Sequence, residues 1–250
     1  MSIELLNKYF ETRAKYMHRL EKLKDEYLSK YYWMQDHIAD YLPNDRRAKI
    51  PVLGSGLGHE VWALNRMGYS NVLGVDIDDN QVEIAKSMGI NCICANVLEF
   101  LERTQETYDA ILAFNFLEHF DLENALKLCK LCYLRLSKDG TLILLTPNAS
   151  NPLAAHNIYN DLTHRIGAFT ETSIAQLLRL AGFKEVIVRN VKPFGISDRI
   201  IWKKNSESYW NFYCISYMAI NTSSIYNQWY KAPKGCFNDL LAVAYKIPRK

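Results

Sequence analysis

The stretch Lys49-Ile50-Pro51-Val52-Leu53-Gly54-Ser55-Gly56-Leu57-Gly58 decides the fold of this chain of 250 residues. Its apolar run is typical of a short buried strand, and a helical pattern begins just beyond the third glycine, near Glu60. Glycine lets a backbone approach a ligand closely, and the N-terminus of a following helix favours negative charge. The stretch therefore predicts a strand, a ligand-binding loop and a helix in succession.

The spacing of the glycines limits the kinds of ligand that the loop can bind. A dinucleotide-binding fingerprint, G-x-G-x-x-G, would need glycine at position 59, where this chain has His59. The observed pattern is G-x-G-x-G, which disfavours a dehydrogenase that binds a pyrophosphate.

Outward from the loop, β-rich runs alternate with helical patterns, which is typical of a parallel sheet built from βαβ units. We predict an α/β, Rossmann-like, seven-stranded and mostly parallel sheet with helices on both faces. The predicted strands are Ile50–Leu53, Asn71–Val75, Ile90–Cys94, Ala110–Asn115, Thr141–Thr146, Glu185–Arg189 and Leu240–Lys246. The predicted helices lie near Glu60–Met67, Asp79–Met88, Leu122–Leu136 and Glu171–Ala181, the last with Thr170 as N-cap and Gly182 as its stop.

This pattern divides the chain into four parts. We predict a helical N-terminal extension over 1–45, the core over 46–190, a helical aromatic insertion over 191–238, and the last strand with a tail over 239–250. The insertion carries Trp202, Trp210 and Trp229, whose rings suit a hydrophobic lid or an interface, or stacking against sugar faces.

The N-terminal extension has an apolar stripe from Ile3 to Tyr41 at heptad spacing, interrupted by Arg13 and Lys24. One interpretation lays one or two helices across the main domain. The other interpretation is a coiled coil between two copies of the chain, which would make the protein a homodimer.

Asp76 ends the second predicted strand at the distance from the glycine loop where a carboxylate can bind both hydroxyls of a ribose. Ile77 beside it offers an apolar surface to an adenine, and the run Asp78-Asp79-Asn80 can cap the following helix. The third strand leads into Ala95-Asn96-Val97, and the fourth into Asn115-Phe116-Leu117-Glu118-His119.

Taken together, these motifs resemble the class I S-adenosylmethionine-dependent methyltransferases over roughly residues 48–190 and the last strand. Thr146-Pro147-Asn148 and Asp161-x-Thr163-His164 make the chain look most like bacterial enzymes that O-methylate polysaccharides and small molecules. The resemblance implies S-adenosylmethionine as cofactor and a role for ten residues in binding it. These are Gly54, Ser55, Gly56 and Gly58 at the methionine half, Asp76 at the ribose, Ile77, Asn96 and Val97 around the adenine, and Asn115 and Phe116 beneath the methionine.

Two positions depart from the family pattern. Val52 stands where an acid usually precedes the glycines and helps to organise the cofactor's amino group, and Asn96 replaces the more typical Asp. Val52 therefore leaves room for weaker binding of the cofactor.

Histidines are the candidates for removing the acceptor's proton, because their unperturbed pKa lies near 6.5. His119 follows the fourth strand, and His164 lies in the loop after the fifth, with Asp161 three residues earlier as an orienting carboxylate. We predict His164, His119 and Asp161 as the catalytic group. Asp161, Glu118 and Asp121 match no metal-ligand spacing, so we expect a metal-free reaction.

Composition limits the partners. The net charge of +3 is too small to indicate nucleic acid, no run is long enough to span a membrane, and no secretory segment opens the chain. We expect a cytoplasmic protein, with peripheral membrane contact left open. The six cysteines are sparse, and Cys129-x-x-Cys132 fits core packing better than a zinc or redox site.

The sequence therefore predicts metal-free O-methylation of a sugar, a glycan or another small polar hydroxyl acceptor. A nicotinamide-dependent oxidoreductase and a non-catalytic binding protein with the same fold are the alternatives.

Overall fold

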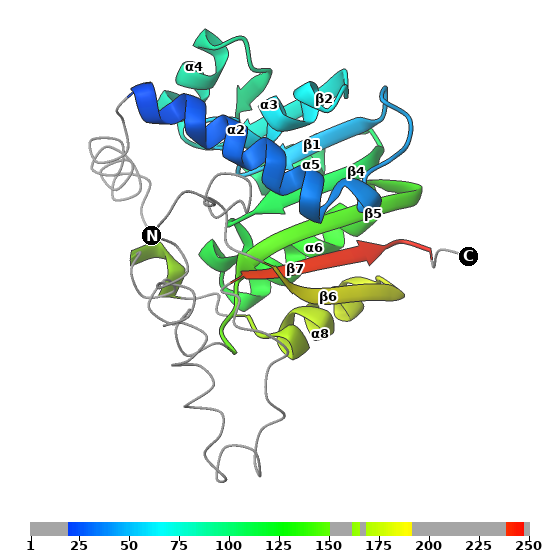
Figure 1. Cartoon of the computed structure of the whole chain (residues 1–250). Helices are drawn as coiled ribbons and strands as arrows, with labels where there is room; N and C mark the ends of the chain where they lie inside the picture. The colour runs from blue at the N-terminus through cyan, green and yellow to red at the C-terminus, as the bar shows by residue number, and fades with distance from the viewer. Residues whose placement is uncertain (1–19, 151–161, 166–168, 192–238, 248–250) are drawn as a thin grey trace.

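The computed structural model describes residues 20–150, 162–165, 169–191 and 239–247. Within them, all seven predicted strands form one sheet with the order β3-β2-β1-β4-β5-β7-β6 (Figure 1). Only β7 runs antiparallel, between β5 and β6. The strands are β1 Lys49–Leu53, β2 Asn71–Asp76, β3 Cys92–Cys94, β4 Tyr108–Phe114, β5 Leu136–Pro147, β6 Glu185–Val191 and β7 Asp239–Tyr245. The predicted Rossmann-like α/β fold is confirmed.

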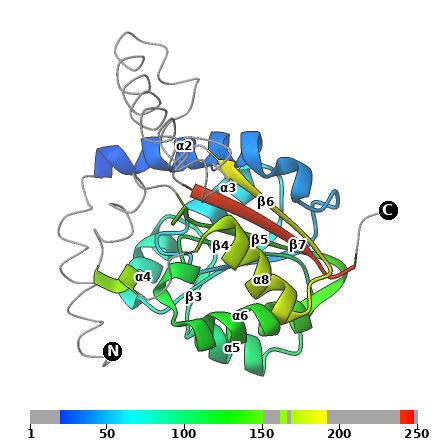
Figure 2. The same cartoon turned by 90° about the horizontal axis from the view of Figure 1, so that it is seen from below.

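Helices cover both faces of the sheet (Figure 2). One apolar core joins the sheet to α2 Leu20–His37, α3 His59–Arg66 and α4 Asp79–Ser87. The other joins it to α5 Val97–Arg103, α6 Leu122–Arg135 and α8 Glu171–Ala181. Because both faces are buried, the central strands are continuous apolar runs rather than alternating ones.

Side chains at the helix starts explain where several helices begin. The Asp78 carboxylate accepts from the backbone of Asn80 at the start of α4, as predicted for the Asp78-Asp79-Asn80 run. Thr170 and Ser173 form a reciprocal capping box on α8, and Gly182 ends that helix at a φ of 114°. Asn96 caps α5, a seven-residue helix that the sequence pattern did not indicate.

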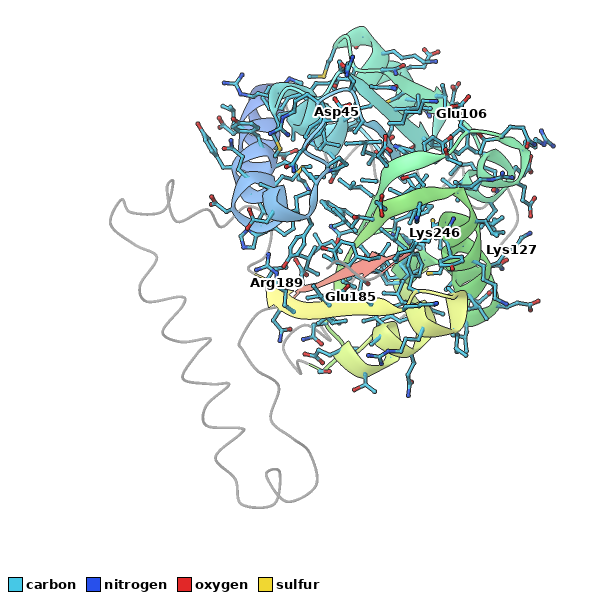
Figure 3. All side chains as sticks on the ribbon, turned by 90° about the vertical axis from the view of Figure 1, so that its right-hand side faces the viewer. Asp45, Glu106, Lys127, Glu185, Arg189 and Lys246 are labelled. Carbon is cyan, nitrogen blue, oxygen red and sulfur yellow. The ribbon has the colours of Figure 1, made fainter. Side chains whose placement is uncertain are left out.

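Helix α2 packs on the chain's own domain. Tyr27, Trp33, Met34 and Ile38 are at most 2% exposed, and they belong to the core that also contains α3. Figure 3 labels Arg189 on β6, whose guanidinium donates to the carbonyl oxygen of His37 at the end of α2. The interpretation that places the N-terminal stripe across the main domain is confirmed for this helix.

Two short segments that matter for the site are the 3-10 turns η2 Leu117–His119 and η3 Leu162–Arg165. Cys129 and Cys132 are buried in the α6 core, as predicted. Among the described helices, none is both long and apolar enough to cross a bilayer. The predicted aromatic insertion and the first half of the N-terminal extension lie outside the described residues.

Candidate active site

The glycine loop between β1 and α3 uses conformations that other residues rarely adopt. Gly54, Gly56 and Gly58 have φ of 68°, 49° and 80°. A Cβ on Gly54 would lie 2.2 Å from the Phe116 ring, so this position has no room for a side chain. The loop therefore lies directly beside the end of β4, where the resemblance places the methionine half of the cofactor.

Asp76 joins the glycine loop to the second strand. Its carboxylate accepts the Gly56 N–H over 2.6 Å and the Asp78 N–H over 2.9 Å. Burial raises the pKa of Asp76, and the backbone donors of Asp78 and Gly56 oppose that rise. Each carboxylate oxygen has a second acceptor site, so Asp76 can bind ribose hydroxyls while it holds the loop.

The residues predicted around the adenine occupy two kinds of position. Ile77 is 45% exposed and offers an apolar side chain beside Asp76. The Asn96 side-chain oxygen accepts from the backbone N–H groups of Leu98 and Glu99. The Val97 side chain is buried in the core beneath α5.

The segment after β4 is held in an unusual conformation. Asn115 has a φ of 49°, the only positive value among the described non-glycine residues, and its N–H donates to the Leu145 carbonyl over 2.8 Å. Asn tolerates this conformation better than most residues. Phe116 packs over Gly54 and edge-on against Phe120, at 5.0 Å between ring centroids. Ser55 belongs to the glycine loop, but its side chain is buried, with the hydroxyl oxygen 3.9 Å from the Cys92 sulfur.

Helix α2 braces the glycine loop from outside. The Tyr27 hydroxyl donates to the Leu57 carbonyl over 2.5 Å, and its ring stacks on His59 at 4.3 Å. Burial lowers the pKa of His59. His59 therefore serves the contact between the loop and α2.

A buried group of charges near the loop was not predicted. Lys30 on α2 is 4% exposed, and its ammonium lies 2.8 Å from the Glu60 carboxylate at the start of α3. Burial opposes ionisation of Glu60, but the charges of Lys30 and His59, with hydrogen bonds from Lys30 and from the backbone, together outweigh burial, so the pKa of Glu60 falls. Desolvation raises the pKa of Asp239, at the start of β7, to about 7 against the attraction of Lys30. The sequence signal was Lys30 itself, three residues after Tyr27 and four before Met34 on the apolar face.

The side chains of the two predicted catalytic histidines lie close together. The ring centroids of His119 and His164 lie 4.7 Å apart, and the His119 Nδ1 is 2.7 Å from the Thr163 hydroxyl. One carboxylate oxygen of Glu118 and one nitrogen of each imidazole lie within 4.8 Å of one another. Glu118 is 1% exposed, so this cluster combines a buried carboxylate with two half-buried imidazoles.

The remaining predicted residues lie elsewhere. Asp161 is outside the described residues. Asp121 caps α6 by accepting the Asn124 N–H over 2.8 Å. Asn148 is fully buried, and its amide donates to Asn190 and Glu171, which anchors the chain as it leaves β5.

This geometry defines a class of protein. The carboxyl ends of the parallel strands in such a sheet are where ligands bind. Here they present glycine backbone, the Asp76 carboxylate and the exposed apolar side chain of Ile77, which suit an adenosine bearing an amino acid. Two imidazoles lie after the neighbouring strands, where a second substrate can reach the cofactor.

Comparison with known proteins agrees with this class. A family model described as a methyltransferase domain matches residues 25–187, and the chain belongs to that family. The chain therefore contains a methyltransferase domain.

Individual relatives are more distant. The phosphoethanolamine N-methyltransferase of Plasmodium falciparum is 26% identical over 156 residues, which are 60% of this chain and 59% of that protein. This chain thus matches little more than half the length of that relative. The fold is similar to an S-adenosylmethionine-dependent methyltransferase of Archaeoglobus fulgidus, with a TM-score of 0.65 and 18% identity over 95% of this chain and 99% of the other. It is also similar to one of Thermotoga maritima, with a TM-score of 0.61 and 16% identity over 98% and 99%.

Proposed function

We propose that this methyltransferase acts on a hydroxyl of a sugar, a glycan or a similar small polar acceptor. The observation that carries the proposal is the pair His119 and His164 after β4 and β5, beside the segment of Asn115 and Phe116. A hydroxyl must lose its proton as it takes the methyl group, and an imidazole can accept that proton near neutral pH.

The chemistry is an in-line displacement. The acceptor oxygen forms a bond to the methyl carbon, the bond from that carbon to sulfur breaks, and the electron pair stays on sulfur as S-adenosylhomocysteine. In the metal-free form that the sequence predicts, His164 accepts the hydroxyl proton and His119 shapes the floor of the pocket. The protein's main contribution is alignment of oxygen, carbon and sulfur.

An amine acceptor is the second candidate. The one observation that favours it is the relative from Plasmodium falciparum, which is a phosphoethanolamine N-methyltransferase. The same two imidazoles would then take a proton from an ammonium group before transfer.

One experiment separates these candidates. The full chain is incubated with methyl-labelled cofactor and panels of nucleotide sugars, glycans and small amines, and mass spectrometry identifies the labelled product. Labelled sugars support the proposal, and labelled amines alone would replace it with the second candidate. Binding of the cofactor without formation of S-adenosylhomocysteine from any acceptor would indicate a non-catalytic protein.

A variant tests the role of the histidines. General-base assistance is worth about 10²–10⁴-fold in rate, so His164→Ala should reduce turnover by that factor and leave cofactor affinity nearly intact. His119→Ala, nearer the cofactor, should reduce both. Full turnover of the His164 variant from pH 6 to 9 would place the base elsewhere.

A further inference from the structure

The cluster Glu118, His119 and His164 has the composition of a metal site. Two short turns that pack against each other, η2 and η3, bring the three side chains together across 45 residues of sequence. Their ligand atoms lie within 4.8 Å of one another. A metal with bonds of about 2.0–2.1 Å needs tetrahedral ligands about 3.3 Å apart, a distance that small rotations of these side chains can reach.

The donor atoms select the kind of ion. Two imidazole nitrogens and one carboxylate oxygen suit Zn²⁺ and similar divalent transition metals, whereas Mg²⁺ and Ca²⁺ prefer all-oxygen sites. Three protein ligands leave a fourth position open, which is the arrangement of catalytic zinc sites rather than structural ones.

A further contact orients one of the ligands. The His119 Nδ1 is 2.7 Å from the hydroxyl of Thr163, the residue directly before His164. When the Nδ1–H donates to that hydroxyl, the lone pair is on Nε2, which is then ready to bind an ion. Metal-binding histidines are commonly fixed in this way by a hydrogen bond at the other nitrogen.

We propose that Glu118, His119 and His164 bind one divalent transition-metal ion, with Zn²⁺ as the best match, and leave a position open toward the acceptor. A bound ion lowers the pKa of a hydroxyl or water in its open position. The two imidazoles would then be ligands, and the ion would replace His164 in activating the acceptor. That role rests on the proposed function and competes with the predicted metal-free route, whereas binding of the ion does not depend on either.

Metal binding is measured on the full chain after treatment with a chelator. Titration with Zn²⁺ against a chromophoric chelator should show one equivalent bound, and Co²⁺ should give the visible absorption of a four- or five-coordinate site. Glu118→Gln, His119→Ala and His164→Ala should each weaken Zn²⁺ binding at least about 100-fold, because the loss of an orienting group alone costs about 10–100-fold. Thr163→Val removes only an orienting group, so it should weaken Zn²⁺ binding by about 10–100-fold.

The matched control is His37→Ala, which removes a histidine that stacks on Trp33 in α2 and lies outside the cluster. It should bind Zn²⁺ as the unchanged chain does. Failure of the unchanged chain to bind Zn²⁺, or binding that persists in all three ligand variants, overturns the proposal. Circular dichroism verifies that each variant is folded. If Glu118→Gln does not fold, the proposal is decided by the Co²⁺ spectrum of the unchanged chain and by the Zn²⁺ affinity of the Thr163→Val variant.

Methyl transfer with and without the chelator separates this proposal from the proposed function. Undiminished formation of S-adenosylhomocysteine after removal of the metal overturns the role of the ion and leaves the methyltransferase function intact. Bound Zn²⁺ without methyl transfer to any acceptor supports the site and overturns the proposed acceptor class.

Discussion

The amide nitrogen of Gly56 lies 2.6 Å from a carboxylate oxygen of Asp76, so the glycine loop and the acid at the end of β2 form one hydrogen-bonded unit. The two residues come from different βα connections that parallel pairing of β1 and β2 places side by side. A change at Asp76 therefore alters the shape of the loop as well as the contact that we predict to the ribose of the cofactor.

Replacing Asp76 by Ala should weaken S-adenosylmethionine binding at least tenfold. Hydrogen bonds to a charged group are worth about 1.5–3 kcal/mol each, and the variant loses those to the ribose as well as the support of Gly56. Calorimetry measures the affinity, with the exposed Asp79→Ala as control. Unchanged affinity in a folded Asp76 variant would remove this carboxylate from the cofactor site.

Gly54→Ala should destabilise the protein more than Gly89→Ala does. Both glycines have positive φ, a conformation that costs other residues about 1–2 kcal/mol. At Gly89 a Cβ meets nothing within 4 Å, whereas at Gly54 it meets the Phe116 ring at 2.2 Å. Urea denaturation compares the free energies of unfolding of the two variants.

The steric part of the Gly54 effect can be tested separately. Adding Phe116→Ala to Gly54→Ala should recover part of the lost stability, because the double variant has no ring for the new methyl group to meet. Equal destabilisation at Gly54 and Gly89 would show that the contact with Phe116 has no energetic importance.

Lys30→Met should cost about 3–5 kcal/mol of stability, because it leaves the Glu60 carboxylate buried without its 2.8 Å partner. Adding Glu60→Gln should recover much of that loss by removing the stranded charge. Since the pKa of Glu60 is lowered in the folded state, the stability that it contributes is present above its ordinary value of 4.5 and is lost as the pH falls further. Denaturation of the single and double variants at pH 7 tests the pair, and additive losses would refute the coupling.

Much of the sheet could be predicted from sequence, because its strands are apolar runs bounded by glycines and charges. Helix α5 was missed because it is short and only two residues separate it from β3, so no loop signal marks its start. The contact between Asp78 and α4 was predictable, since a cap is local to its helix.

Contacts between distant segments were harder to predict. Lys30 and Glu60 are on different helices, and neither has a sequence neighbour that indicates the other. The sequence singled out both histidines, but their proximity to Glu118 depends on how η3 packs on η2, which no local pattern specifies. That packing brings together three side chains whose spacing in the chain matches no metal motif.

Asp239→Asn should make the protein more stable at pH 8 and change it little at pH 4. Desolvation raises the pKa of Asp239 from 3.8 to about 7, so the folded state holds a proton that the unfolded state releases. Between these two values the folded state binds more protons, and stability therefore falls as the pH rises from about 4 to 7. The amide of Asn imitates the protonated acid and removes this dependence.

The measurement is the free energy of unfolding of both proteins across pH 4 to 8. Lys30 favours the ionised carboxylate of Asp239, so Lys30→Met should raise the pKa of Asp239 and extend its part of the decline in stability to higher pH, whereas Asp239→Asn removes that part. Asp109→Asn is the control, because that carboxylate accepts the Lys49 N–H at the opposite end of β1, far from Lys30. Parallel pH profiles for the unchanged chain and the Asp239 variant would show that this carboxyl group titrates at its ordinary pKa.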